Sequence, residues 1–166
     1  MKTLKELLKD TPVEALHGDD SAAVAGLVYD SRAVRPGDCF FATRGTQCDG
    51  HDFIPSAIAK GAAAVVCERL PEQTADGVAY AVVPDAAGAL ADMAAAFYGH
   101  PSRELKLVGV TGTNGKTTTV TLLYDLVRTL GYKAGLISTV VYKIGDRTVE
   151  ATHTTPDSVR LNAMMR

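Results

Sequence analysis

Residues 105–119, which read LKLVGVTGTNGKTTT, constrain the fold of this chain more than any other stretch. An apolar segment leads into a turn that carries Gly109, Gly112 and Gly115, and a polar stretch then starts at Lys116. This order predicts a buried strand, a phosphate-binding loop and a helix. Backbone N–H groups at the start of such a helix face an anion, and the helix dipole adds positive potential there.

The residue types of this loop indicate that it binds a nucleotide and a metal ion. Lys116 supplies a mobile ammonium for the β- and γ-phosphates and is the candidate catalytic residue, while the Thr117 hydroxyl is a candidate Mg²⁺ ligand. We therefore expect the chain to bind ATP or a close relative, with Mg²⁺. The candidate nucleotide-binding residues are Gly112, Thr113, Asn114, Gly115, Lys116, Thr117 and Thr118.

The loop departs from the strict phosphate-loop pattern, because Val110 stands where that pattern has its first glycine. Its context still favours the interpretation. Residues 105–110 form an apolar run typical of a strand buried on both faces. One helical stripe of apolar residues follows, at Leu123, Leu126, Val127 and Leu130. Gly131 then marks a helix end. The alternative is a strand–helix turn whose glycines only permit tight packing.

Composition excludes several classes of protein. The 166 residues are 46% hydrophobic and 22% charged, which is ordinary for a globular protein. The net charge of −2 gives no basic face for nucleic acid. The N-terminus lacks the apolar region of a signal peptide, and no stretch is long enough to span a membrane. The three cysteines are odd in number and lack the spacing of metal ligands, so they predict reduced thiols in a cytoplasmic protein. A monomer is the default expectation for the oligomeric state.

The order of apolar segments predicts an α/β fold with two domains. Residues 99–102 read GHPS and break the helical pattern, so we place the boundary between domains 1–101 and 102–166. The first domain is a small mixed α/β unit. Its predicted strands are residues 26–29, 38–43, 63–67 and 78–83, and its predicted helices are residues 53–60 and 86–98.

The second domain is expected to be the start of a parallel-sheet, phosphate-loop domain that is incomplete in this chain. Beyond the first strand and helix, residues 134–138 are predicted as a strand. Residues 140–144 and 147–151 flank Gly145-Asp146 and predict a β-hairpin. A last helix is predicted from Pro156, with Thr155 as its N-cap.

Three separated stretches resemble one family. Residues 29–42 (YDSRAVRPGDCFFA), continuing at residues 49–53 (DGHDF), resemble the N-terminal domain of the Mur ligases. Residues 109–119 (GVTGTNGKTTT) resemble the ATP loop of that family, including its departure from the strict pattern. Residues 152–157 (THTTPD), after the predicted hairpin, resemble the MurE type of Mur ligase in particular.

The resemblance implies an ATP-dependent amide ligase of peptidoglycan precursor synthesis. Such an enzyme adds a diamino acid, meso-diaminopimelate or L-lysine, to UDP-N-acetylmuramoyl-L-Ala-D-Glu through an acyl phosphate. The N-terminal domain would bind the UDP part, and further Mg²⁺ ligands and a carbamylated lysine would lie beyond Arg166, so this chain alone is expected to be inactive. The implied substrate-binding residues are Ser31, Thr46, Gln47, Cys48, His153, Thr154 and Thr155.

Without the resemblance, several of these residues have structural interpretations. Asp30-Ser31-Arg32 is then a strand-end turn held by local hydrogen bonds, with Arg32 paired to Asp30 or Asp38. The stretch 46–50 is a polar loop, and Thr154 and Thr155 cap a helix. His51 is interpreted as a loop or surface histidine.

Other functions remain open from the sequence. The MurF type, which adds a D-Ala-D-Ala unit, shares the Asp-Ser-Arg segment and a similar ATP loop. Folylpolyglutamate synthases share the loop style but are not expected to carry that segment. An alternative from a different functional class is a nucleotide-binding module without ligase chemistry. Recognition of a UDP-sugar by the first domain separates a ligase from such a module.

Overall fold

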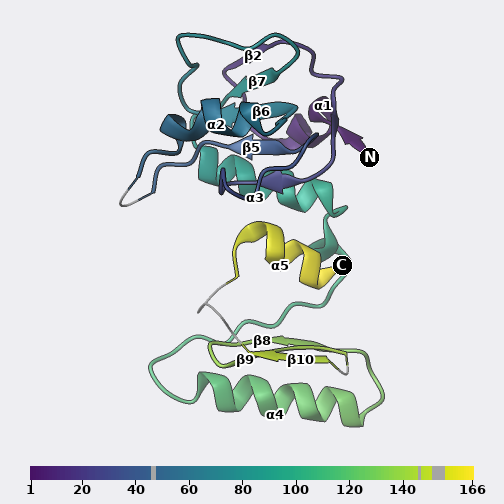
Figure 1. Cartoon of the computed structure of the whole chain (residues 1–166). Helices are drawn as coiled ribbons and strands as arrows, with labels where there is room; N and C mark the ends of the chain where they lie inside the picture. Colours follow the sequence, from purple (N-terminus) through teal and green to yellow (C-terminus); the bar gives the residue numbers. More distant parts are fainter. Residues whose placement is uncertain (46–47, 146, 151–155) are drawn as a thin grey trace. The chain divides into compact units, whose positions relative to one another are not determined.

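A computed structural model describes residues 1–45, 48–145, 147–150 and 156–166. The chain forms two compact units, Met1–His100 and Pro101–Arg166. The division between them lies one residue before the predicted boundary. Both units combine helices and strands, so the predicted α/β class is confirmed. Figure 1 shows the elements of each unit.

The first unit is built on a five-stranded sheet of order β2-β7-β6-β5-β4. Strands β4 to β7 run parallel, while β2 pairs antiparallel with β7 at one edge. All four strands predicted for this domain are confirmed, and each is shorter than predicted. The strands are β2 (Ala15–His17), β4 (Leu27–Val28), β5 (Cys39–Phe41), β6 (Ala64–Cys67) and β7 (Ala79–Val82).

Helices cover both faces of this sheet because the central strands are apolar on both sides. Every residue of β5 and β6 is buried, and neighbouring side chains of a strand point to opposite faces. Helix α2 (Ile54–Ala59) packs Ile54 and Ala57 against Phe40 and Val65. Helix α3 (Ala86–Phe97) contacts β5 and β6, and it lies on the other side of the sheet (Figure 1). Both predicted helices are confirmed.

The N-terminal segment closes the core beside α3. Strand β1 (Lys2–Thr3) pairs with β3 (Ala23–Val24), and α1 (Leu4–Leu7) follows with a capping box between Thr3 and Glu6. Leu4 and Leu7 are fully buried. The described residues also contain three short 3₁₀ segments, η1 (Leu8–Asp10) and η2 (Gly50–Phe53) in the first unit and η3 (Pro101–Arg103) at the start of the second.

Within its described residues, the second unit contains two α-helices, the segment η3 and an antiparallel sheet of order β10-β9-β8. The helix predicted after the loop is confirmed, and it ends before Gly131, whose φ is 84°. The predicted hairpin is confirmed as β9 and β10. The elements are α4 (Lys116–Thr129), β8 (Gly135–Ile137), β9 (Val141–Ile144), β10 (Arg147–Glu150) and α5 (Ser158–Met165).

The strand predicted at residues 105–110 is wrong for the described structure. These residues belong to no helix or strand and pair with no described strand, and Leu107 and Val108 are 63% and 67% exposed. A strand buried on both faces needs neighbours to bond its backbone and cover its side chains. Within the described residues, the strands of the second unit pair only antiparallel among themselves. The parallel sheet expected after residue 102 is therefore not formed by this part of the chain.

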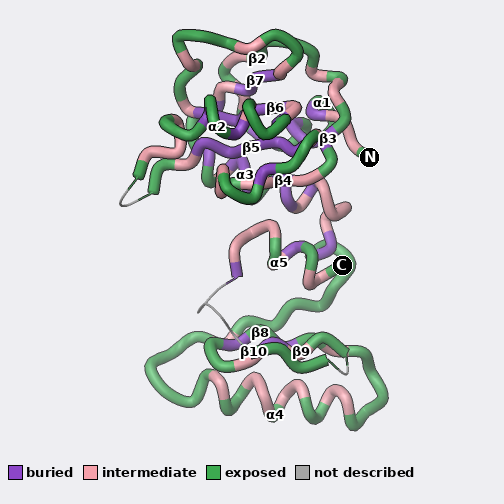
Figure 2. Tube along the Cα trace, viewed as in Figure 1, coloured by how far each residue is buried: buried purple, intermediate pink, exposed green. Residues whose placement is uncertain are grey.

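The structure also corrects two smaller predictions, the start of the last helix and the burial of α4. Helix α5 begins at Ser158 rather than Pro156, because the Asp157 carboxylate accepts the Arg160 backbone N–H at 2.8 Å and acts as the N-cap. The predicted cap Thr155 lies outside the described residues. The apolar stripe of α4 is only partly covered, since Leu126 and Leu130 are exposed. Figure 2 shows the contrast between the buried strands of the first unit and the largely exposed second unit.

Candidate functional site

The phosphate-binding loop lies at the start of α4. Gly115 is the residue before the helix and has a φ of 78°, while Gly112 has a φ of 143°. Both values favour glycine, because a Cβ strains the backbone in this region. No side chain caps the start of α4. The N–H groups of its first turn are therefore available to an anion.

Lys116 lies over the loop that precedes it. Its Nζ donates hydrogen bonds to the backbone oxygens of Gly112 and Thr113, the second at 3.3 Å. The side chain is exposed, so an incoming phosphate can replace these carbonyl acceptors. Thr117 is half-buried in the first helical turn, whereas the other predicted nucleotide-binding residues are exposed. The structure thus brings the predicted loop residues together at one helix start.

A Mg²⁺ ion fits this loop only together with a nucleotide. Among the described residues, no group of three or more His, Cys, Asp or Glu side chains is arranged to hold a metal. The Thr117 hydroxyl is a hard oxygen ligand of the kind Mg²⁺ accepts, but it supplies one ligand only. Because Mg²⁺ needs six oxygens in an octahedron, the phosphates and water would supply the rest.

The described candidate residues of the first unit, Ser31 and Cys48, lie in segments that follow parallel strands of the sheet. Strands β4 to β7 run parallel, so the segments that follow each of them leave at the same side. In open α/β sheets, ligands bind beyond the carboxyl ends of the strands. Ser31 follows β4 there, Arg44 follows β5, Glu68 follows β6 and Asp85 follows β7. We call these segments the carboxyl edge.

The Asp30-Ser31-Arg32 segment forms a tight turn at this edge. Asp30 Oδ1 accepts the Arg32 backbone N–H at 2.9 Å, and the Arg32 guanidinium bonds both carboxylate oxygens of Asp30. These bonds lower the pKa of Asp30 to about 2. Lys60 Nζ donates to the backbone oxygens of Ser31 and Arg32 at 2.9 and 3.1 Å. The local turn expected without the resemblance is therefore present, and it fixes the backbone of Ser31.

A short hairpin follows β5. Arg44 and Asp49 form an isolated antiparallel bridge, and the Gly45 N–H donates to the Cys48 oxygen at 2.9 Å. The Gly50 N–H donates to the Thr43 oxygen at 2.9 Å, two residues after the end of β5. A Cβ on Gly50 would lie 2.5 Å from the Thr43 oxygen, so only glycine fits there without a shift of the backbone. The thiol of Cys48 is exposed, and Thr46 and Gln47 lie outside the described residues.

The predicted contacts to the muramoyl-peptide part cannot be placed against this edge. His153, Thr154 and Thr155 lie outside the described residues. The other two cysteines, Cys39 and Cys67, are buried in the first unit, and none of the described cysteines forms a disulfide. Burial raises the pKa of Cys67 to about 11, which keeps it in the unreactive thiol form at neutral pH.

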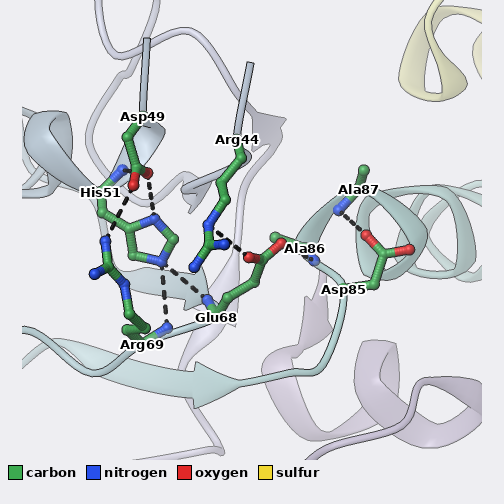
Figure 3. Close-up of polar contacts among 8 residues, drawn as sticks. All are labelled: Arg44, Asp49, His51, Glu68, Arg69, Asp85, Ala86 and Ala87. Atoms are coloured by element: carbon green, nitrogen blue, oxygen red, sulfur yellow. Dashed lines mark hydrogen bonds and ion pairs between the residues drawn. The ribbon is translucent and has the colours of Figure 1, made fainter. Parts of the chain in front are cut away.

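His51 was expected in a loop or at the surface, and the surface interpretation is wrong for its side chain. Its side chain is only 9% exposed and bonds the Asp49 carboxylate and the backbone after β6 (Figure 3). Asp49 caps η2 by accepting the His51 backbone N–H at 3.0 Å. A possible signal in the sequence was Asp49 itself, because an aspartate two residues before a histidine is placed to cap and to bond its ring.

Two family models match the chain. The model of the Mur ligase family catalytic domain matches residues 23–98, and the model of the Mur ligase middle domain matches residues 110–166. The chain belongs to the Mur ligase family. The two matches fall in the first and second structural units respectively, so the family assignment covers both candidate sites.

Known relatives cover the same two units. A Cytophaga hutchinsonii protein named UDP-N-acetylmuramoyl-L-alanyl-D-glutamate–2,6-diaminopimelate ligase is 52% identical over 164 residues, 98% of this chain and 34% of that protein. A solved structure of a ligase of this name matches 99% of this chain and 33% of its own, with a TM-score of 0.75 and 25% identity.

A solved Thermotoga maritima MurF ligase in complex with ADP matches 86% of this Mur ligase chain and 35% of its own, with a TM-score of 0.50 and 27% identity. The chain spans about a third of the length of the curated relatives it matches. In the part of the chain that the structure describes, no helix is long and apolar enough to cross a membrane.

Proposed function

We propose that this chain forms the acceptor-binding and nucleotide-binding parts of an ATP-dependent ligase that adds 2,6-diaminopimelate to UDP-N-acetylmuramoyl-L-alanyl-D-glutamate. The observation that carries the proposal is the loop before α4, where Lys116 lies beside an uncapped helix start. Packing alone gives no reason for an exposed lysine at this position. Membership of the Mur ligase family, together with the name of the 52% identical relative, supports the choice of acceptor and amino acid.

The proposed reaction has two steps. The D-Glu carboxylate of the acceptor attacks the γ-phosphorus of ATP, which gives an acyl phosphate and ADP. The amine of diaminopimelate then attacks the acyl carbon, phosphate leaves and an amide forms. Both steps develop negative charge on phosphoryl oxygens, so catalysis depends on position and on electrostatic stabilisation.

The residues of the loop supply that stabilisation. The N–H groups of the first turn of α4 donate to phosphate oxygens, and the Lys116 ammonium offsets charge on the β- and γ-phosphates. The Thr117 hydroxyl would hold Mg²⁺, which when bound neutralises charge between the β- and γ-phosphates. Because Lys116 already bonds two loop carbonyls, its ammonium is directed to the loop before the nucleotide arrives.

The carboxyl edge of the first unit is the proposed site of the UDP part of the acceptor. Ser31 lies in a turn whose backbone Lys60 bonds, and Cys48 is exposed in the neighbouring hairpin. Thr46, Gln47, His153, Thr154 and Thr155 complete the proposed substrate-binding set. The protein is proposed to act in the cytoplasm as a monomer, where ATP and soluble precursors are available.

Calorimetric titration with ATP·Mg²⁺ tests the nucleotide site. Lys116→Met should weaken ATP binding by about tenfold or more, because it removes a charge-assisted contact worth about 1.5–3 kcal/mol. Lys133→Met is the matched control, since Lys133 is an exposed lysine of the same unit. Equal ATP affinity of the wild type and Lys116→Met would contradict the assignment of Lys116.

A second experiment separates the MurE type from the MurF type. In the protein that carries this chain, labelled diaminopimelate should enter the product with UDP-N-acetylmuramoyl-L-Ala-D-Glu as acceptor. Incorporation of D-Ala-D-Ala instead would favour the MurF alternative. Binding of ATP without recognition of any UDP-sugar would favour a nucleotide-binding module without ligase chemistry.

A further inference from the structure

The imidazole of His51 lies at the carboxyl edge between two segments that are distant in sequence. Its Nδ1 lies 2.6 Å from Asp49 Oδ1, and its Nε2 lies 3.0 and 3.2 Å from the backbone nitrogens of Glu68 and Arg69. Figure 3 shows the ring between the hairpin after β5 and the segment after β6. A single side chain thus connects the ends of two neighbouring strands.

These contacts define which ring nitrogen donates and which accepts a hydrogen bond. A backbone N–H can only donate, so Nε2 must present its lone pair to Glu68 and Arg69. The ring proton is then on Nδ1, from which it is donated to Asp49. The contacts therefore define one tautomer, with Nε2 as the acceptor and Nδ1 as the donor. A second proton on Nε2 would face two donors and break the contact with the segment after β6.

Charged groups on both sides complete the connection. Asp49 also bonds Arg69, with Oδ2 and Nη2 3.0 Å apart. Glu68 bonds Arg44 Nε at 3.0 Å and accepts the Ala86 N–H at the start of α3 at 3.3 Å. The hydrogen bonds from His51 and the charge of Arg69 lower the pKa of Asp49. Arg44 and Asp49, the two bridged residues of the hairpin, are thus both tied to the residues that follow β6.

We propose that His51 is a positioning residue, which holds the hairpin base formed by Arg44, Gly45, Cys48 and Asp49 at the carboxyl edge and thereby sets the affinity for the UDP-linked acceptor. The choice of ligand rests on the proposed function, whereas the positioning of the hairpin rests on the contacts of His51 alone. His51 itself is buried among protein atoms, so its effect on the ligand passes through the hairpin.

Two substitutions and one control test this role. His51→Phe keeps the ring shape and removes both nitrogens. His51→Gln keeps one acceptor and one donor without a titratable ring. His17→Gln is the control, because His17 lies exposed on the edge strand β2. Each variant of the chain is titrated with UDP-N-acetylmuramoyl-L-Ala-D-Glu and, separately, with ATP·Mg²⁺ as the reference for an intact second unit.

We expect His51→Phe to weaken acceptor binding by about tenfold, which corresponds to about 1.4 kcal/mol, and to leave ATP affinity unchanged. His51→Gln should restore most of the acceptor affinity, and His17→Gln should match the wild type. In the wild type, the ¹⁵N shifts of the His51 ring should show the proton on Nδ1. A residue needed only for stability would lower the melting temperature without this selective loss of one ligand.

Several results would overturn the proposal. They are wild-type acceptor affinity in His51→Phe, no rescue by His51→Gln, or a ring proton on Nε2. If His51→Phe fails to fold, the His51→Gln affinity and the wild-type ring shifts still decide. If the wild type binds no acceptor, the proposed function of this edge fails instead. Hydrogen exchange at the Gly45 amide then decides the positioning role, since faster exchange in His51→Phe supports it and unchanged exchange refutes it.

Discussion

Similar apolar segments are buried in the first unit of this chain and exposed in the second. Residues 64–67 of the first unit read AVVC and are fully buried, whereas residues 105–110 of the second read LKLVGV and are mostly exposed. Strand β6 has β5 on one side and β7 on the other. The stretch 105–110 pairs with no described strand of its unit.

This difference shows that an apolar segment forms a strand only when neighbouring segments pair with it and cover it. An apolar run predicts burial, but the backbone bonds and the covering side chains must come from neighbouring segments. In the first unit, β5, β7, α2 and α3 supply both. The second unit positions its phosphate-binding loop by the glycines and the helix start, and these local features do not require a complete sheet.

The largest expected difference between the units concerns their cores. Phe40→Ala removes a side chain that is 1% exposed within a buried apolar cluster of the first unit, so it should lower the free energy of unfolding of that unit by about 3–5 kcal/mol. Leu107→Ala in the second unit should change it by less than about 0.5 kcal/mol. Urea unfolding of both variants measures this. Equal losses would show that residues 105–110 are packed in solution.

A smaller contrast concerns two glycines. Gly50→Ala places a Cβ 2.5 Å from the Thr43 oxygen and 2.8 Å from its nitrogen, so it should destabilise the first unit by about 1–3 kcal/mol. Gly109→Ala should have little effect, since a Cβ there meets no atom within 4 Å. Thermal unfolding of both variants tests this contrast. A stable Gly50→Ala protein would mean that Gly50 does not lie against the Thr43 backbone as described.

The smallest expected effect concerns the charge of Asp30. Its pKa in the folded protein, about 2, lies below its ordinary value of 3.8, so its charge stabilises the fold above pH 3.8 and this contribution is lost as the pH falls through about 2. Asp30→Asn keeps the turn acceptor and removes the charge. Because the Asp30 side chain is 37% exposed, the loss at pH 7 should be only a few tenths of a kcal/mol.

Denaturant unfolding of Asp30→Asn at pH 7 and near pH 2 checks the sign of this effect. The difference from the wild type should be present at pH 7 and shrink at the acid end. Asp92→Asn, at an exposed position of α3, is the control. A difference that grows toward acid would contradict the role given to the Arg32–Asp30 bonds.

Much of the first unit and the nucleotide loop could be predicted from the sequence. Continuous apolar runs indicated β6 and β7, and the spacing of Gly112, Gly115 and Lys116 indicated the loop, because these signals are local. His51 could not be placed in this way. Its partners include the backbone N–H groups of Glu68 and Arg69. Since every residue except proline carries such a group, no residue pattern indicates which of them bond His51. The strand at residues 105–110 failed because its burial depends on other segments.

Ligand mapping by NMR on the ¹⁵N-labelled chain tests the central claim most directly, namely that the two units bind two different ligands. ATP·Mg²⁺ should shift the amide signals of Gly112 to Thr118. UDP-N-acetylmuramoyl-L-Ala-D-Glu should shift those of the carboxyl edge, around Ser31, Cys48 and Glu68. Shifts from both ligands at the loop before α4 alone, with no response at the carboxyl edge, would contradict the account.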